Sequence, residues 1–353
     1  QTTRGGWGKS NSNFSAHKTA KINLSIPLWM LEPENSYFQP MKRFVWVLVL
    51  LFLEITLLHA QCTSKELFLQ VDSAWTFQKL QLVPFKFKQM GRAQIDLLEG
   101  AKPLLSLKDA LQRGKIKVAE FYSNHDADIR VLTVKNLSKQ AIIINEGDLL
   151  AGGKQDRMVA ETKILAPGTE EFLNVFCVEP GRWDSKPKPF KFGGTADLAL
   201  RNTMLSSGRQ SEIWKSIEKQ FGVGHGLPEG FNYIENQQTL SDSAKIYLAY
   251  FKERLTYSDS SYAGFLSITG DKIIGCELFS DQNFTLLSID NIFEAAIAQA
   301  LQHGSLPVMK QEAMEAAIKP LIESEPAQKH FLEKHGKAFY YRNRIVHIRV
   351  FDF

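Results

Sequence analysis

Apolar residues follow two different spacings along the chain, and the change of spacing separates an early part from a later part. Between residues 80 and 178, apolar and polar positions mostly alternate or form short apolar runs, which is typical of β-strands. We predict strands at 80–87, 116–122, 129–134, 141–144, 148–151, 159–165 and 171–179. Pro84 lacks a backbone N–H, so the first strand is predicted at a sheet edge. Ser106 predicts the N-cap of one short helix, 107–113, which Gly114 ends.

After residue 210 the apolar positions recur every three or four residues, which is the period of a helix with one buried face. This spacing predicts helices at 211–221, 239–255, 281–302 and 309–322. Trp214 falls on the apolar face of the first of them and is predicted in the core. Alternation returns twice and predicts β-hairpins, at 262–279 around Gly270 and at 337–351 around Asn343. The fold class is therefore α+β: an early antiparallel β meander followed by helices with late β-hairpins.

The strand predicted at 171–179 is the best defined of the early ones. Phe172 and Phe176 lie on one face of it, and Leu173 and Val175 lie on the other. Both faces are mostly apolar, so we expect this strand in the middle of its sheet. Pro180-Gly181 ends it, and the Pro-, Lys- and Gly-rich residues 184–194 are predicted to be a surface connector.

The N-terminal residues differ from the rest in composition. Residues 1–40 are polar and aperiodic and are interpreted as a disordered or non-native extension. Residues 41–60 have a basic start, a short apolar run and Ala60 at the end, which is typical of a signal peptide. We expect export to the periplasm or secretion. The alternatives are a lipid anchor on Cys62, which the bulky Gln61 disfavours, or a retained membrane anchor. Residues 61–353 are predicted to be a single domain, with a division into two lobes near 184–194 as the alternative.

Charge and cysteine content narrow the function classes. The chain has 42 Lys and Arg against 38 Asp and Glu, for a net charge of +4. Six of the basic and three of the acidic residues precede residue 61, so the remainder is nearly neutral and has no basic stripe for nucleic acid. The three cysteines form no C-x-x-C pair, and no metal site or cofactor is expected. Cys177 and Cys276 fall in predicted strands and are expected to be buried free thiols, with a disulfide between them as the alternative.

The densest group of polar residues lies between residues 152 and 183. Gly152 and Gly153 permit positive φ angles or a close backbone approach, and they precede Lys154-Gln155-Asp156-Arg157. Some twenty residues later, the strand at 171–179 leads into Arg182-Trp183. The glycine spacing is not that of a phosphate-binding P-loop.

These two segments resemble the paired signature of the ARPP family, named for ARG and rhodanese-phosphatase-superfamily-associated protein domain. Its members typically contain GGKQNR and CVEQGRW, whereas this chain has GGKQDR and CVEPGRW, with Asp156 and Pro180 as the departures. The resemblance extends over about residues 75 to 353. It implies a fold and a candidate site, but the family has no established activity, so it implies no reaction.

Three hypotheses follow for this signature. In the first, a non-catalytic module binds a small anion or a peptide, without nucleic acid and with no membrane contact beyond the signal peptide or a lipid anchor. Its contacts would be Gly152, Gly153, Lys154, Gln155, Asp156, Arg157, Arg182 and Trp183. In the second, a hydrolase uses carboxylates such as Glu161, Glu179 and Asp156, or Cys177 as nucleophile. In the third, the same residues form a purely structural network in which Arg182 pairs with Glu179 or Glu146. All three hypotheses require the turn and the strand end to meet in space.

Overall fold

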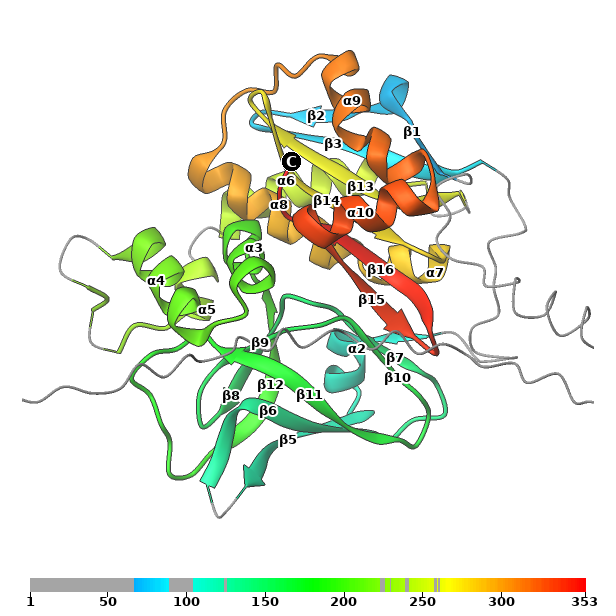
Figure 1. Ribbon diagram of the computed structural model, residues 1–353. Coiled ribbons are helices and arrows are strands. Elements are labelled where there is room, and N and C mark those ends of the chain that lie inside the picture. The colour runs from blue at the N-terminus through cyan, green and yellow to red at the C-terminus, as the bar shows by residue number, and fades with distance from the viewer. Residues whose placement is uncertain are drawn as a thin grey trace, which may run out of the picture. The chain divides into compact units, whose positions relative to one another are not determined.

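The computed structural model describes residues 67–88, 104–123, 126–222, 226–228, 230–238, 241–256, 259 and 261–353 (Figure 1). The predicted extension, the predicted signal peptide and Cys62 lie outside these residues. Every element described below belongs to one compact unit, residues 59–353. The structure combines antiparallel sheets with helices, so the predicted α+β class is confirmed.

The larger sheet is built mostly from the two late hairpins. Its strands run in the order β1 (Leu67–Leu69), β3 (Leu80–Phe87), β13 (Tyr262–Thr269), β14 (Lys272–Phe279), β16 (Arg344–Val350) and β15 (Gly336–Tyr341), and β2 (Trp75–Phe77) also pairs with β3. All neighbours are antiparallel. Arg342 and Asn343 have positive φ angles of 48° and 62°, as the tight turn between β15 and β16 requires. Both predicted hairpins are confirmed.

Strand β3 is not at a sheet edge, so the prediction from Pro84 is wrong. β13 pairs along one side of β3, while the short strands β1 and β2 share the other side. Pro84 lies between the stretches that β1 and β2 cover, and its carbonyl accepts a hydrogen bond from the N–H of Gln70 at 2.8 Å. A backbone N–H at residue 84 would point to the same side of β3 as this carbonyl, into the gap between β1 and β2. An interior strand therefore tolerates this proline.

Helices cover both faces of the larger sheet (Figure 1). α6 (Ser241–Arg254), α7 (Gln282–Leu287) and α8 (Ile289–His303) pack on one face through Phe251 and Phe293. α9 (Gln311–Ile322) and α10 (Glu325–His335) pack on the other. The single helix predicted at 281–302 is two helices, because Ser288 adopts a non-helical conformation between them. The helix predicted at 309–322 is α9, with Pro320 in its last turn, whereas α10 was not predicted.

The smaller part of the unit contains the early strands. A six-stranded sheet has the order β12 (Lys188–Thr195), β8 (Asp148–Gly153), β9 (Arg157–Val159), β11 (Glu170–Cys177), β6 (Asp126–Asn136) and β5 (Ile116–Ser123). A three-stranded sheet joins β10 (Lys163–Leu165), β7 (Ile142–Ile144) and β4 (Leu105–Ser106), next to α2 (Leu107–Gln112). The hydroxyl of Ser106 accepts a hydrogen bond from the N–H of Asp109 and caps α2 as predicted.

Two predictions about this part need correction. The stretch 159–165 is not one strand, because the chain passes from β9 to β10 in the other sheet at residues 160–162. Most of 184–194 is not a connector, because β12 pairs with β8 across two register shifts. The bulges accommodate the Pro and Gly residues that suggested a loop. β11 is central as predicted, although Phe172 on its outer face remains 57% exposed.

Three helices cover part of the six-stranded sheet and complete a separate apolar core with it. They are α3 (Leu198–Ser207), α4 (Gln210–Phe221) and α5 (Tyr233–Gln238), of which only α4 was predicted. Ile213 and Ile217 of α4 face this core, whereas Trp214 is 36% exposed, so its predicted burial is wrong. No helix among the described residues is long and apolar enough to span a membrane.

Candidate functional site

The glycine turn of the signature lies where β12 passes close to the β8–β9 connection. Gly152 and Gly153 have φ angles of 120° and 56°. A Cβ atom on Gly152 would lie 2.6 Å from the carbonyl oxygen of Pro189, and one on Gly153 would lie 2.2 Å from Cζ of Phe190. Both the backbone conformation and the proximity of β12 therefore require glycine here.

Arg182 joins this turn to the end of β11. Its Nη2 lies 2.7 Å from Oδ1 of Asp156, its Nε lies 2.5 Å from Oε2 of Glu179, and its Nη1 lies 2.6 Å from Oδ2 of Asp184. The same guanidinium donates to the carbonyls of Gly152 and Gly153, at 3.3 Å each. The two predicted segments thus meet in one polar cluster. Arg182 pairs with Glu179 as expected, but not with Glu146.

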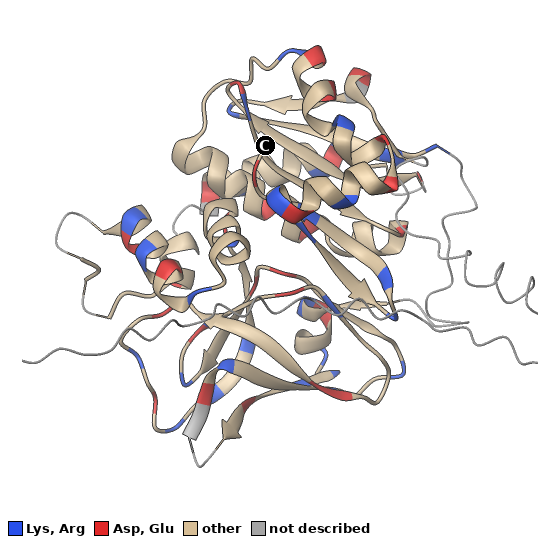
Figure 2. Cartoon of the chain, viewed as in Figure 1, with Lys and Arg blue, Asp and Glu red and all other residues tan. Residues whose placement is uncertain are grey.

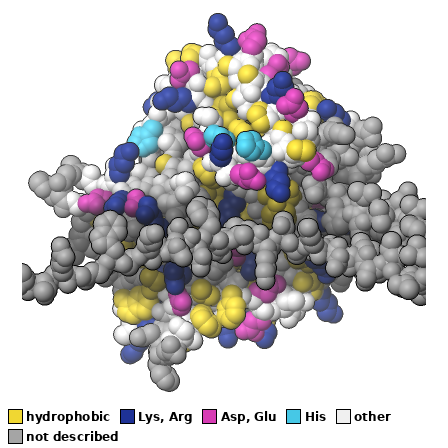
Figure 3. All heavy atoms as spheres, in the orientation of Figure 1, with side chains coloured by type: hydrophobic (Ala, Val, Ile, Leu, Met, Phe, Trp, Pro, Cys, Tyr) yellow, Lys and Arg dark blue, Asp and Glu magenta, His cyan; other side chains and the backbone are white. Residues whose placement is uncertain are grey.

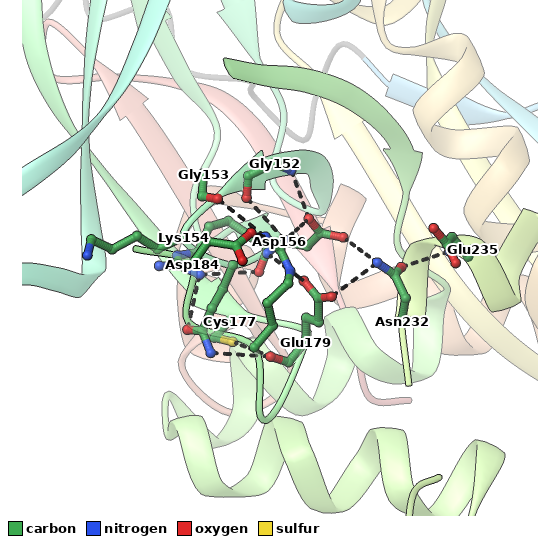
Figure 4. Close-up of polar contacts among 12 residues, drawn as sticks. Gly152, Gly153, Lys154, Asp156, Cys177, Glu179, Asp184, Asn232 and Glu235 are labelled. Carbon is green, nitrogen blue, oxygen red and sulfur yellow. Dashed lines mark hydrogen bonds and ion pairs between the residues drawn. The ribbon is translucent and has the colours of Figure 1, made fainter. Parts of the chain in front are cut away.

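Asp156 and Glu179 are held together by further hydrogen bonds. The N–H of Asp156 donates to Glu179 at 3.2 Å, and the N–H of Gly152 donates to the Asp156 carboxylate at 2.8 Å. Both carboxylates point toward Asn232, whose amide donates to each of them (Figure 4). Burial, with Asp156 nearby, raises the pKa of Glu179. The cluster therefore stabilises two adjacent acidic side chains mainly through Arg182 and Asn232.

Arg157 lies in the interior of the same cluster. Its side chain is fully buried, its Nη1 donates to Gln155 at 3.3 Å, and its Nη2 lies 3.8 Å from a carboxylate oxygen of Glu120 on β5. Burial lowers the pKa of this guanidinium. Gln155 is also buried, and its amide donates to the carbonyl of Glu179. Neither side chain is accessible to a ligand in solution.

Lys154 and Trp183 reach the surface, and the side chain of Arg182 is also 25% exposed. The Lys154 ammonium lies 4.9 Å from the centre of a Trp183 ring, and Trp183 is 44% exposed. The backbone of Lys154 remains tied to the cluster, because its N–H donates to Glu120 at 2.6 Å and its carbonyl accepts from Asp184 at 3.0 Å. This cation–π pair covers the network and is partly open to solvent.

The charges of the cluster do not favour an anion. Lys154, Arg157 and Arg182 face four carboxylates, namely Glu120, Asp156, Glu179 and Asp184. An incoming anion would have to compete with the carboxylates that occupy the donors of Arg182, and it could not reach Arg157, which is fully buried. Within the described residues, no three His, Cys, Asp or Glu side chains converge as metal ligands would. The geometry thus fits the structural hypothesis for the two arginines.

Of the residues named for hydrolysis, the structure brings Asp156 and Glu179 together, but it does not bring Glu161 to them and it buries Cys177. Cys177 is fully buried, burial raises the pKa of its thiol, and the thiol lies 3.5 Å from the carbonyl of Glu179. A thiol without solvent access and with a raised pKa is a poor nucleophile. Glu161 lies away from Glu179 and Asp156, and accepts a hydrogen bond from Asn174. Cys177 and Cys276 are buried and are not joined in a disulfide, as predicted.

An open groove of about 800 Å³ lies beside the signature strand. Its walls come from β6 and β11, from the β9–β10 connection, from α3, α4 and the connection between them, and from β15. Its lining includes three basic side chains, Arg130, Arg209 and Lys337, and one acidic side chain, Glu161. Gln210 connects this wall to the signature, because it accepts from the N–H and donates to the carbonyl of Cys177, at 2.8 Å each. The groove was not predicted, since its residues are distant in sequence.

A second charged network, also unpredicted, is buried between the sheets. Arg201 of α3 lies 2.6 Å from Glu146 and 2.9 Å from Glu277. Arg349 lies 3.7 Å from both carboxylates, and His347 lies 3.4 Å from Glu277. All five side chains are nearly or fully buried. The arginines hold the pKa of Glu277 well below its usual range, whereas burial lowers the pKa of His347. This network joins the early strands to the larger sheet.

Asp148, at the start of β8, provides a testable pH dependence. Burial raises the pKa of Asp148 from 3.8 to about 7. The unfolded chain releases this proton near pH 3.8, whereas the folded chain keeps it until about pH 7, so the contribution of Asp148 to stability falls as the pH rises.

An Asp148→Asn variant lacks this titration. Urea unfolding should show the advantage of the parent over the variant shrinking by about 2 kcal/mol from pH 5 to pH 7. Parallel pH profiles would contradict the assignment.

Comparison with known proteins confirms the resemblance seen in the sequence. Residues 68–351 match the family described as ARG and Rhodanese-Phosphatase-superfamily-associated Protein domain, ARPP-1. No curated protein and no solved structure matches the chain.

Proposed function

The chain belongs to the ARPP-1 family, and on this premise we propose that it is a non-catalytic binding module. Its ligand is an acidic peptide segment that occupies the groove beside β11. The signature residues act as an internal frame that fixes the end of β11. They are not the ligand contacts.

The charge of the groove is the observation that supports this proposal. Arg130 and Arg209 have side chains that are 72% and 70% exposed, and their nearest carboxylates lie at 4.0 Å and 3.7 Å, which leaves them weakly paired. Apolar side chains such as Phe176, Met204 and Leu205 also line the groove. A lining of basic and apolar side chains suits a segment with acidic and apolar residues.

The position of the groove relates it to the signature. β11 carries Asn174 and Phe176 into the groove and ends at Cys177, where Gln210 holds the start of α4. Arg182 and Asp156 then fix the backbone that follows Cys177. This arrangement accounts for a polar signature in which Gln155, Asp156, Arg157 and Glu179 are all buried.

A charge-reversal experiment tests the groove. A fluorescein-labelled peptide of alternating Asp and Leu residues is titrated with the parent and with Arg209→Glu combined with Lys337→Glu, and anisotropy is measured. We expect the variant to bind about tenfold more weakly or worse, because repulsion replaces attraction at two points. Lys215→Glu combined with Lys219→Glu, on α4 outside the groove lining, is the matched control. Equal affinities for all three proteins would refute the proposal.

On the face of the molecule drawn in Figures 2 and 3, basic and acidic residues of the described part of the chain are interspersed. Lys, Arg, Asp and Glu are interspersed over the helices and strands in Figure 2, and α4 pairs Arg209 and Lys215 with Glu212. Figure 3 likewise shows both signs mixed among the described side chains on the visible face. This mixture supports a local partner in preference to a polyanion such as nucleic acid.

We also infer export from residues 41–60, which lie outside the described residues. Expression of the chain in a secreting host should give a product whose intact mass corresponds to a start at Gln61. A product that stays in the cell and retains Met41 would contradict export, and a lipid-modified Cys62 would favour the anchored alternative.

A further inference from the structure

We propose that a second cavity, separate from the groove, binds a small organic amine whose ammonium group pairs with Glu294. The cavity has a volume of about 370 Å³ and lies among β12, α5, α6 and α8, with Lys108 of α2 at its border. None of its lining residues belongs to the groove or to the signature. The proposal is therefore independent of the function proposed above.

Most of the cavity wall is apolar. Ile234, Leu248, Ile297 and Ala298 contribute side chains, and the backbone of Gly193 and Gly194 contributes a bare strand edge. A volume of this size with few polar groups is typical of a small-molecule site. An aliphatic or aromatic body of a ligand would bury its surface against these side chains.

Glu294 is the acidic group of this wall. Among the described residues, no ion pair to Glu294 is formed. The nearby lysines are engaged elsewhere: Lys108 and Lys252 lie 3.3 Å and 2.5 Å from Asp290, and Lys245 lies 3.0 Å from Asp242. Lys108 and Lys252 therefore act on the carboxyl of Glu294 electrostatically without forming a direct ion pair with it, and an ammonium group in the cavity would supply that pair.

Charged groups of both signs and one hydroxyl surround Glu294. The carboxylate of Asp290 raises the pKa of Glu294, and Glu294 in turn raises the pKa of Asp148. The hydroxyl of Thr195 lies beside the Glu294 carboxyl. Burial raises the pKa of Glu294, so its carboxylate form is poorly stabilised without a ligand. An ammonium group could pair with this carboxylate and donate a further hydrogen bond to the hydroxyl of Thr195.

Three isosteric probes test the proposal on the full chain by isothermal titration calorimetry: n-hexylamine, n-hexanol and hexanoate. They share an apolar body and differ in the charge of the head group. We expect n-hexylamine to bind at least tenfold more tightly than n-hexanol, and hexanoate to bind most weakly. In Glu294→Gln the amine should lose at least tenfold in affinity, while n-hexanol should change by less than twofold.

Two controls locate the effect. Glu253→Gln changes an exposed carboxylate of α6 that is not part of the lining, and should leave amine binding unchanged. Ala298→Leu fills the cavity and should abolish binding of both the amine and the alcohol. The proposal is overturned if the amine does not bind, if it binds no better than the alcohol, or if Glu294→Gln binds it as the parent does. n-Hexanol binding to Glu294→Gln shows that the cavity of that variant is intact.

Discussion

Replacing Arg201 by methionine is expected to lower the free energy of unfolding by about 3 to 5 kcal/mol. Arg201 contributes two hydrogen bonds to Glu146 and two to Glu277, between 2.6 and 3.1 Å. Methionine fills a similar volume but leaves two carboxylates buried with only Arg349 and His347 nearby. The loss reflects this uncompensated charge, more than the contribution of the ion pairs themselves.

Urea unfolding of the parent, Arg201→Met and Arg113→Met measures this effect. Arg113 is an exposed arginine that pairs with Asp109 at 3.7 Å, so its replacement should cost less than about 0.5 kcal/mol. A further variant, Arg201→Met with Glu146→Gln and Glu277→Gln, should recover part of the loss, because the unpaired charges are removed. A loss for Arg201→Met as small as that for Arg113→Met would show that the network does not hold the sheets together.

Replacing Arg182 by methionine is expected to cost about 3 kcal/mol. Asp156 and Glu179 are buried, and they would keep only Asn232 and backbone donors as partners. Burial already raises the pKa of Glu179, and loss of Arg182 would raise it further above the unfolded value. Since the unfolded chain releases this proton at lower pH, the variant should lose more stability at pH 8 than at pH 5.5.

Chemical denaturation at both pH values tests this expectation. Lys154→Met is the matched control, because it removes a cation of the same signature whose side chain makes only the contact with Trp183 among the contacts described. It should cost less than about 1 kcal/mol and should show no added pH dependence. Equal stability of Arg182→Met and Lys154→Met would contradict the account, because it would show that Arg182 does not stabilise the three carboxylates around it.

Residue patterns within a short stretch of sequence predicted the hairpins and the helix start, because interactions between neighbouring residues determine these elements. The late hairpins follow from alternation and from turn residues that accept positive φ angles, as at Asn343. The start of α2 follows from the cap at Ser106. The pairing of the two signature segments was also predicted, because their polar side chains have few other ways to be satisfied near a central strand.

Long-range packing decided the features that the sequence did not reveal. Pro84 suggested an edge, but two short strands with a gap between them accommodate it inside the sheet. Residues 188–195 are rich in Pro, Lys and Gly, yet they form a bulged strand because β8 offers an unpaired edge. Arg201 gave no signal, because nothing local shows that Glu146 and Glu277 lie beside it. Arg157 was interpreted as a ligand contact, since a charged residue after a turn is usually exposed.

One paired measurement distinguishes the structural role proposed for the signature residues from the binding role proposed for the groove. The affinity for the labelled Asp-Leu peptide and the free energy of unfolding are determined together for the parent, for Arg182→Met, and for Arg209→Glu combined with Lys337→Glu. We predict that Arg182→Met loses stability but, while folded, keeps its peptide affinity within about threefold. The groove variant should keep its stability and lose its affinity. A folded Arg182→Met protein that no longer binds the peptide, beside a groove variant that binds normally, would contradict this assignment and make the signature itself the ligand site.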